Sequence, residues 1–194
     1  MKIAFIGGGN MATALIAGLV KDGASTTQVH VVDRNPEALE RLAALYGATT
    51  AGAIDAAVGA ADVIVLAVKP QQMRDVAAEL APRLTQGPLV LSIAAGIRGA
   101  DLSRWLGGHG AIVRAMPNTP ALIGMGITAL VALPGVRGDQ RAAADSVLRA
   151  VGQTVWLDDE ALIDPVTAVS GSGPAYVFYF LEAMQAAAGE MGLS

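Results

Sequence analysis

The sequence contains no cysteine, few charged residues and no long apolar run. Without cysteine, its 194 residues can form no disulfide framework, no thiolate nucleophile and no cysteine zinc site. Charged residues make up 15% and the net charge is -4, which argues against binding to nucleic acid or to an anionic membrane through basic residues. No stretch approaches the ~20 apolar residues that span a bilayer, and the apolar run Ile3–Ile6 is shorter than the roughly 7–15 residues of a signal-peptide core. We therefore expect a soluble, cytoplasmic protein with no nucleic-acid or membrane partner.

Hydrophobic residues make up 53% of the chain, in short β-rich runs that alternate with alanine-rich helical segments. This alternation is typical of the α/β class, in which helices cover both faces of a doubly wound, mostly parallel sheet. The predicted strands are Lys2–Ile6, Val29–Asp33, Val63–Val68, Leu89–Ile93, Ala111–Met116, Ile127–Leu133 and Thr154–Leu157. The predicted helices include Asn10–Lys21, Pro36–Tyr46, Pro70 to about Leu84 and Gln140–Val151.

The pattern changes from Asp158 onward, where helical segments dominate. We place a domain boundary near residue 160, between a cofactor domain (1–160) and the start of a helical domain (161–194). Breaks are predicted at Asp164-Pro165 and at 170–174, and a last helix begins near Pro174. A helix hairpin of this size cannot bury its own apolar face, which needs the first domain, another subunit or further sequence. The acidic run Asp158–Glu160 is read as a helix N-terminus rather than a metal site, and no metal is expected.

The first predicted strand ends in a glycine-rich loop. Gly7, Gly9 and Ala12 fit G-x-G-x-x-A, and the loop follows a strand and opens a helix, as a dinucleotide-binding fingerprint requires. Gly7 would allow the tight turn, Gly9 would let a diphosphate approach the backbone, and Ala12 would permit close packing of helix on strand. The sequence thus predicts a Rossmann-type cofactor domain.

The second predicted strand ends at Asp33, near the position where the adenosine ribose of a dinucleotide is bound. Asp33 could accept hydrogen bonds from both ribose hydroxyls, which favours NAD. The adjacent Arg34 and Asn35 could bind a 2'-phosphate, which favours NADP. If the Asp33 carboxylate points at the 2' position, it would repel that phosphate. If the carboxylate is turned away, Arg34 could bind the phosphate. The sequence therefore leaves NADP(H) and NAD(H) both open.

Three further strand ends carry candidate residues, because ligands of doubly wound sheets lie beyond the carboxyl ends of the strands. Lys69 could contact a ribose, a phosphate or a substrate carboxylate, or be an exposed loop lysine. The small residues 92–96 suit a ring lying close to the backbone. Asn118, flanked by two prolines in its loop, could bind a carboxamide or a ribose hydroxyl, or only form a turn.

Five motifs, in this order, resemble those of pyrroline-5-carboxylate reductases, and the resemblance covers essentially the whole chain. They are Gly7-Gly8-Gly9-Asn10-Met11, Ala67-Val68-Lys69-Pro70, Ala94-Ala95-Gly96, the run from Arg114 to Pro120 and the run from Val169 to Tyr176. The last two are more specific than the glycine loop. The resemblance implies NAD(P)H-dependent reduction of 1-pyrroline-5-carboxylate to L-proline, by hydride transfer to the cyclic imine carbon. It also implies a helical domain that exchanges helices in a homodimer, with higher assembly in some members.

The resemblance also assigns site residues. The cofactor would be bound by Ile6, Gly7, Gly8, Gly9, Asn10, Met11, Ala12, Asp33, Arg34, Ala67, Val68, Lys69, Pro70, Ala94, Ala95 and Asn118. The turn that closes the substrate site between the domains would be formed by Gly171, Ser172, Gly173 and Pro174. The family's substrate-carboxylate loop is expected beyond Ser194, so the helical domain and the substrate site are expected to be incomplete in this chain.

Hydride transfer to a protonated imine needs little acid–base chemistry, because the cofactor supplies the hydride and the iminium is already electrophilic. No catalytic residue is therefore assigned, and Tyr176 is a candidate proton donor that could equally belong to a core or interface. Two other functions stay open. A β-hydroxyacid dehydrogenase would carry a catalytic lysine after its first domain, and no lysine follows Lys69 here. A silent module would bind NAD(P) without turnover.

Overall fold

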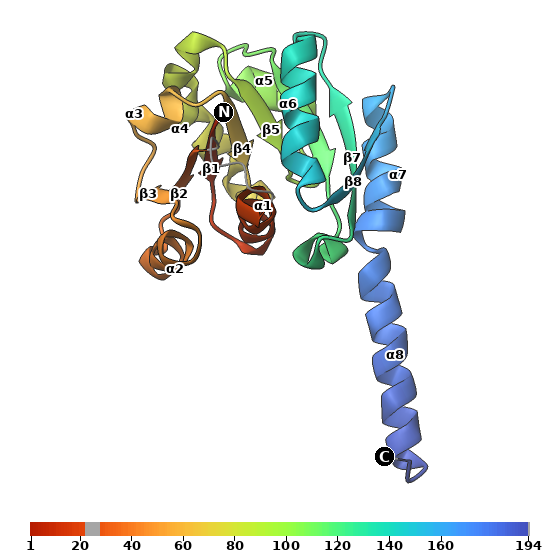
Figure 1. Cartoon of the computed structure of the whole chain (residues 1–194). Helices are drawn as coiled ribbons and strands as arrows, with labels where there is room; N and C mark the ends of the chain where they lie inside the picture. The colour runs from red at the N-terminus through yellow and green to blue at the C-terminus, as the bar shows by residue number, and fades with distance from the viewer. Residues whose placement is uncertain (22–27, 194) are drawn as a thin grey trace.

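The structure, a computed structural model, describes residues 1–21 and 28–193. Within these ranges eight strands form one sheet in the spatial order β3-β2-β1-β4-β5-β6-β7-β8 (Figure 1). Neighbouring strands are parallel except for β6 and β7, which are antiparallel. The strands are β1 (Lys2–Ile6), β2 (Gln28–Val32), β3 (Thr49–Ala51), β4 (Val63–Leu66), β5 (Leu89–Ser92), β6 (Ile112–Met116), β7 (Gly126–Ala132) and β8 (Gly152–Trp156).

Helices cover both faces of this sheet, as the alternating sequence predicts. The α-helices are α1 (Asn10–Lys21), α2 (Pro36–Tyr46), α3 (Ala56–Gly59), α4 (Met73–Leu80), α5 (Gly99–Trp105), α6 (Gly138–Arg149), α7 (Ile163–Val166) and α8 (Gly173–Glu190). Shorter helical turns are η1 (Pro70–Gln72), η2 (Ala81–Gln86), η3 (Thr119–Ile123), η4 (Glu160–Leu162) and η5 (Thr167–Gly171), of which η5 is a π turn. The doubly wound, mostly parallel α/β fold is confirmed.

Two apolar cores hold the layers together. On one face, Leu15 of α1 and Leu148 of α6 are buried in a cluster with Phe5 of β1. On the other face, Leu80 of α4 and Leu102 of α5 are buried with residues of β4 and β5. All four residues of β4 are buried, as expected for a central strand covered on both sides.

Local signals in the sequence explain where α2 begins and ends. The Asn35 side chain accepts a hydrogen bond from the Glu37 N–H at 3.0 Å, and Pro36 occupies the first helical position, where its missing N–H costs nothing. Gly47 ends the helix in the left-handed conformation. The predicted bounds of α1 and α2 are both confirmed. Most of the observed strands end one or two residues before the predicted strand ends.

Several short elements differ from the sequence prediction. The single helix predicted from Pro70 to about Leu84 is wrong, since α4 is flanked by the separate turns η1 and η2. Pro82 lies at the start of η2, because a proline inside a continuous helix would remove a hydrogen bond and clash. Strand β3 and helices α3 and α5 were not predicted. Each is at most seven residues long, too short for its periodicity to stand out.

The breaks predicted after residue 160 are also wrong. The chain is helical almost continuously from Glu160 to Glu190, through η4, α7, the π turn and α8. Pro165 and Pro174 do not interrupt it, because each lies in the first turn of its own helical element, where backbone N–H groups lack an intrahelical partner. Ser172 has right-handed helical φ and ψ, so the glycine-serine run continues the helix.

Helix α8 projects from the domain and packs against no other described element along most of its length (Figure 1). None of its residues is buried. The side chains of Phe178, Tyr179 and Leu181 are exposed by 58%, 77% and 48%. In the described residues the sheet and the helices on its faces therefore leave this apolar helix uncovered. No helix of the described residues has the length and apolar character needed to cross a membrane.

Candidate active site

The predicted cofactor residues gather where the chain order of the sheet reverses. Strand β1 lies between β2 and β4, and the chain runs from β1 to β2 on one side but from β4 to β5 on the other. The Ala67 N–H donates to the Ile6 carbonyl at 2.8 Å, and the Gly7 N–H donates to the Val32 carbonyl at 2.8 Å. The carboxyl ends of β1, β2 and β4 thus meet at one edge. A crevice at such a switch point is where doubly wound folds bind ligands.

The glycine loop fits a dinucleotide diphosphate. Gly7 has a φ of +104°, and a Cβ there would lie 2.6 Å from the Ala67 carbonyl oxygen, so only glycine fits. A Cβ at Gly9 would meet no described atom within 4 Å, so the backbone faces open space. The Thr13 N–H makes the first helical bond, to the Gly9 carbonyl. The N–H groups of residues 10–12 precede it, and such first-turn groups are available to an anion. Ala12 is buried at 1% exposure beneath them.

Asp33 is turned toward the glycine loop. Its Oδ2 accepts the Gly8 N–H at 2.6 Å and its Oδ1 accepts the Asn35 N–H at 2.8 Å. Arg34 is exposed, and it forms no hydrogen bond or ion pair with the residues that the structure describes. Asn35, the other residue predicted to bind a 2'-phosphate, uses its side chain to cap α2. Among the residues that the structure describes, Arg34 is therefore an unpaired cation at this strand end.

The residues assigned to the nicotinamide half follow two adjacent strands. Ala67 and Val68 are half-buried beyond β4, whereas Lys69 and Pro70 are exposed. The next strand, β5, is followed by Ala94, which is 7% exposed and whose N–H donates to the Ser92 hydroxyl at 3.4 Å. The Ile93 N–H donates to the Leu66 carbonyl, which holds the two strand ends together. Both segments therefore lie on the same edge of the sheet as the glycine loop.

Asn118 is buried, and its side-chain oxygen and nitrogen each make one hydrogen bond to the protein. Its Oδ1 accepts the Ile127 N–H at 3.0 Å, and its Nδ2 donates to the Ser170 hydroxyl at 3.3 Å. This geometry places a structural link at the end of β6, where the sequence allowed either a ligand contact or a turn. The link also brings the helical segment to the cofactor edge.

The segment Gly171–Pro174, predicted as a turn, is instead the junction between the π turn and α8. The Ser172 N–H donates to the Thr167 carbonyl, five residues back, at 2.9 Å. A Cβ at Gly171 would lie 3.5 Å from Met116 Sδ, so this backbone packs close to the end of β6. π turns inside helices are frequent at functional sites. Tyr176 is 62% exposed on the first turn of α8.

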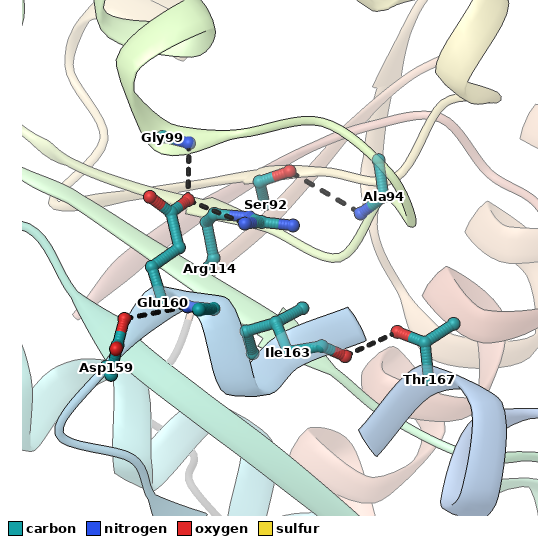
Figure 2. Close-up of polar contacts among 9 residues, drawn as sticks. Ser92, Ala94, Gly99, Arg114, Asp159, Glu160, Ile163 and Thr167 are labelled. Atoms are coloured by element: carbon teal, nitrogen blue, oxygen red, sulfur yellow. Dashed lines mark hydrogen bonds and ion pairs between the residues drawn. The ribbon is translucent and has the colours of Figure 1, made fainter. Parts of the chain in front are cut away.

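One ion pair that involves a buried arginine could not be read from the predicted elements. Arg114 in β6 is 3% exposed, and its Nη1 lies 2.6 Å from Glu160 Oε1 (Figure 2). The predicted acidic helix start is correct for Asp159, which caps η4 by accepting the Ala161 N–H. A signal was present, because an arginine inside an otherwise apolar strand must find a buried anion.

Comparisons with known proteins agree with this geometry. Residues 2–96 match the family model described as NADP oxidoreductase coenzyme F420-dependent. Residues 160–194 match the one described as pyrroline-5-carboxylate reductase dimerisation. A pyrroline-5-carboxylate reductase of Pseudomonas aeruginosa is 48% identical over 193 residues, covering all of this chain and 71% of the relative.

Two solved structures extend the likeness to three dimensions. A pyrroline-5-carboxylate reductase of Coxiella burnetii has a TM-score of 0.89 and 41% identity, over 99% of this chain and 72% of the other. The pyrroline carboxylate reductase of Plasmodium falciparum, solved with NADP bound, has a TM-score of 0.85 and 27% identity, over the whole of this chain and 71% of the other.

Proposed function

Because the chain belongs to the pyrroline-5-carboxylate reductase family, we propose that it reduces 1-pyrroline-5-carboxylate to L-proline, the last step of proline biosynthesis, with NADPH as the reductant. The observation that carries this proposal is the 48% identity over 193 residues to a reductase of that name. The glycine loop at the switch point of the sheet supports it independently, because Gly7 allows the tight turn and Gly9 leaves backbone exposed where a diphosphate would bind.

We propose that residues 6–12 hold the cofactor diphosphate and that Arg34 holds the adenosine 2'-phosphate. Two backbone N–H groups hold the Asp33 carboxylate against the glycine loop and partly offset its charge. The exposed guanidinium of Arg34 has no competing partner among the described residues. This arrangement favours NADPH over NADH. When bound, the cofactor supplies the hydride.

The chain's own contribution to the reaction is positioning. The cyclic iminium is already electrophilic, so the protein needs only to hold two rings in a near-attack arrangement. We propose that residues 67–70 with Ala94 and Ala95 line the nicotinamide half. The junction Gly171–Pro174, held beside β6 by the bond between Ser170 and Asn118, would close the substrate side. No side chain is required to donate a proton, and Tyr176 stays a candidate.

We propose that residues 161–194 begin the dimerisation and substrate domain, after a cofactor domain of residues 1–160, and that α8 packs against a second copy. The match of residues 160–194 to a reductase dimerisation family supports this. The exposed apolar side chains of α8 support it too, because monomeric proteins rarely expose contiguous apolar surface of this extent. The cytoplasmic location also stays a prediction.

One titration tests the proposed function. The protein is added to NADPH while nicotinamide fluorescence is followed, and pyrroline-5-carboxylate is then added to the same solution. A loss of NADPH that depends on the substrate, with proline formed, supports the reductase. Binding of NADPH with no change on adding substrate would favour the silent NAD(P)-binding module instead.

A further inference from the structure

Arg114 is a buried cation in the middle of β6. It is paired in register with Ser92 of β5, so both side chains face the same side of the sheet (Figure 2). A guanidinium does not lose its proton in a protein, and a buried charge requires a partner. The partner is Glu160, at the start of the helical segment, whose Oε1 lies 2.6 Å from Arg114 Nη1.

The same carboxylate oxygen also makes a hydrogen bond to the first residue of α5. Glu160 Oε1 accepts the Gly99 N–H at 2.6 Å. Gly99 begins α5 and is buried, and a Cβ there would lie 2.5 Å from Leu133 Cδ1. The loop that leads to Gly99 leaves β5 through Ala94 and Ala95, the residues assigned to the nicotinamide half. One oxygen therefore joins β6, the cofactor-side loop and the first turn of the helical segment.

The helical segment also contacts the end of β6 farther along the chain. Ile163, at 1% exposure, belongs to the same buried cluster as Met116 of β6. Farther along, Ser170 bonds to Asn118, and Gly171 lies close to Met116. Both ends of the segment are thus fixed along β6. Glu160 joins the start of the segment that carries Gly171–Pro174 directly to the end of the cofactor-side loop, through the Gly99 N–H.

We propose that Glu160 is a positioning residue for imine reduction. Through its bond to the Gly99 N–H it sets the cofactor-side loop against the segment that carries Gly171–Pro174, whereas its ion pair with Arg114 neutralises the buried guanidinium. This inference rests on the proposed function. Reaction requires the reacting atoms to approach within about 3–3.5 Å, and a misplacement of about 1 Å can cost roughly 100-fold in rate. Loss of the Gly99 bond should therefore lower kcat while the affinity for NADPH is retained.

Two double variants separate the bond to Gly99 from the ion pair. Both Arg114→Met with Glu160→Gln and Arg114→Met with Glu160→Leu remove the two charges together, a change that proteins often tolerate. The glutamine Oε1 can still accept the Gly99 N–H, and leucine cannot. We expect the glutamine pair to keep kcat within about threefold of wild type and the leucine pair to lose about tenfold or more. The dissociation constant for NADPH, measured by fluorescence, should stay within about twofold in both.

If the double variant with leucine fails to fold, a single substitution can test the same bond. Glu160→Asp keeps the charge but is one methylene shorter, so it cannot reach both Arg114 and Gly99, and the same loss of kcat at constant NADPH affinity is expected. Asp159→Asn is the matched control, because asparagine also caps a helix, and its kcat should stay within about twofold of wild type.

Two results would overturn the inference alone. These are equal kcat values for the two double variants, and a parallel loss of kcat and NADPH affinity in the leucine pair, which would indicate a general structural role. A wild-type protein that binds NADPH but does not reduce pyrroline-5-carboxylate would overturn the proposed function together with this inference, and it is recognised before any variant is compared.

Discussion

The Gly8 N–H donates a hydrogen bond to Asp33 Oδ2 at 2.6 Å. This contact ties the strand end that we propose to face the adenosine ribose to the loop that we propose to face the diphosphate. It also turns the Asp33 carboxylate toward the loop, so that the neighbouring Arg34 is the charged group left to meet a 2'-phosphate. We therefore propose that Arg34, rather than Asp33, determines the choice between NADPH and NADH that the sequence left open, and that it favours NADPH.

Arg34→Ala should weaken binding of NADPH selectively. Removing the guanidinium removes a charge-assisted contact to the 2'-phosphate, which NADH lacks. We expect KM for NADPH to rise about tenfold or more, with KM for NADH changed less than about twofold. Steady-state kinetics with each cofactor measures both. Arg41→Ala, at an exposed position of α2, is the control, and an equal effect of Arg34→Ala on both cofactors would contradict this assignment.

Gly9→Val should abolish cofactor binding without unfolding the protein. Its side chain enters space that no described atom occupies and that the diphosphate needs. We expect the dissociation constant for NADPH to rise more than about 100-fold, while Tm changes little. Gly7→Ala is the contrasting variant, because its Cβ would strike the Ala67 carbonyl at 2.6 Å and its φ is positive, so Tm itself should fall. Unchanged NADPH affinity in Gly9→Val would refute the role of the loop.

Charge introduced on α8 should disrupt self-association. Phe178→Glu together with Leu181→Glu places carboxylates among exposed apolar side chains that would become buried between copies. We expect sedimentation velocity to show a homodimer or larger assembly for wild type and mainly monomer for the variant. Gln185→Glu on the same helix tests the effect of charge alone at a polar position. A wild-type protein that sediments as a monomer would contradict the proposed interface.

Asp145 should contribute stability that depends on pH. Burial alone would raise the pKa of its carboxyl, but hydrogen bonds from Thr154, Arg149 and Trp156 outweigh that cost and lower the pKa. A lowered pKa in the folded state stabilises above the unfolded value of about 3.9, and this contribution is lost as pH falls through the folded pKa.

The matching variant is Asp145→Asn. We expect its Tm at pH 7 to lie about 2–4 °C below that of wild type, a gap that should close as pH falls below about 4. The exposed Asp75→Asn serves as control. A gap for Asp145→Asn that stays constant down to pH 2.5 would show that the ionised carboxylate is not the cause.

Local patterns predicted the fold where one element carries its own signal. In three places a few neighbouring residues are enough to predict the local structure. These are the apolar run of β4, the asparagine and glycine at the two ends of α2, and Gly7 with Gly9 before α1. The breaks predicted at Pro165 and Pro174 failed because a proline's effect depends on its position within a helix. That position is fixed here by contacts of Ile163 and Gly171 with β6, far away in the sequence.

The candidate site shows the same division. The cofactor side follows strand ends, so its residues could be predicted from the order of strands. The orientation of Asp33, the double engagement of Asn118 and the junction at Glu160 could not, since each depends on a partner 25 to 61 residues distant. Residue types alone do not specify such long-range hydrogen bonds.

The central claim is that this protein transfers hydride from NADPH to the imine carbon of pyrroline-5-carboxylate. The most direct test supplies NADPH carrying deuterium at both positions of nicotinamide carbon 4 and analyses the product by mass spectrometry. We expect proline with one deuterium, on the ring carbon that was the imine carbon, in a one-to-one ratio with NADPH oxidised. NADPH that binds while no labelled proline forms would contradict it.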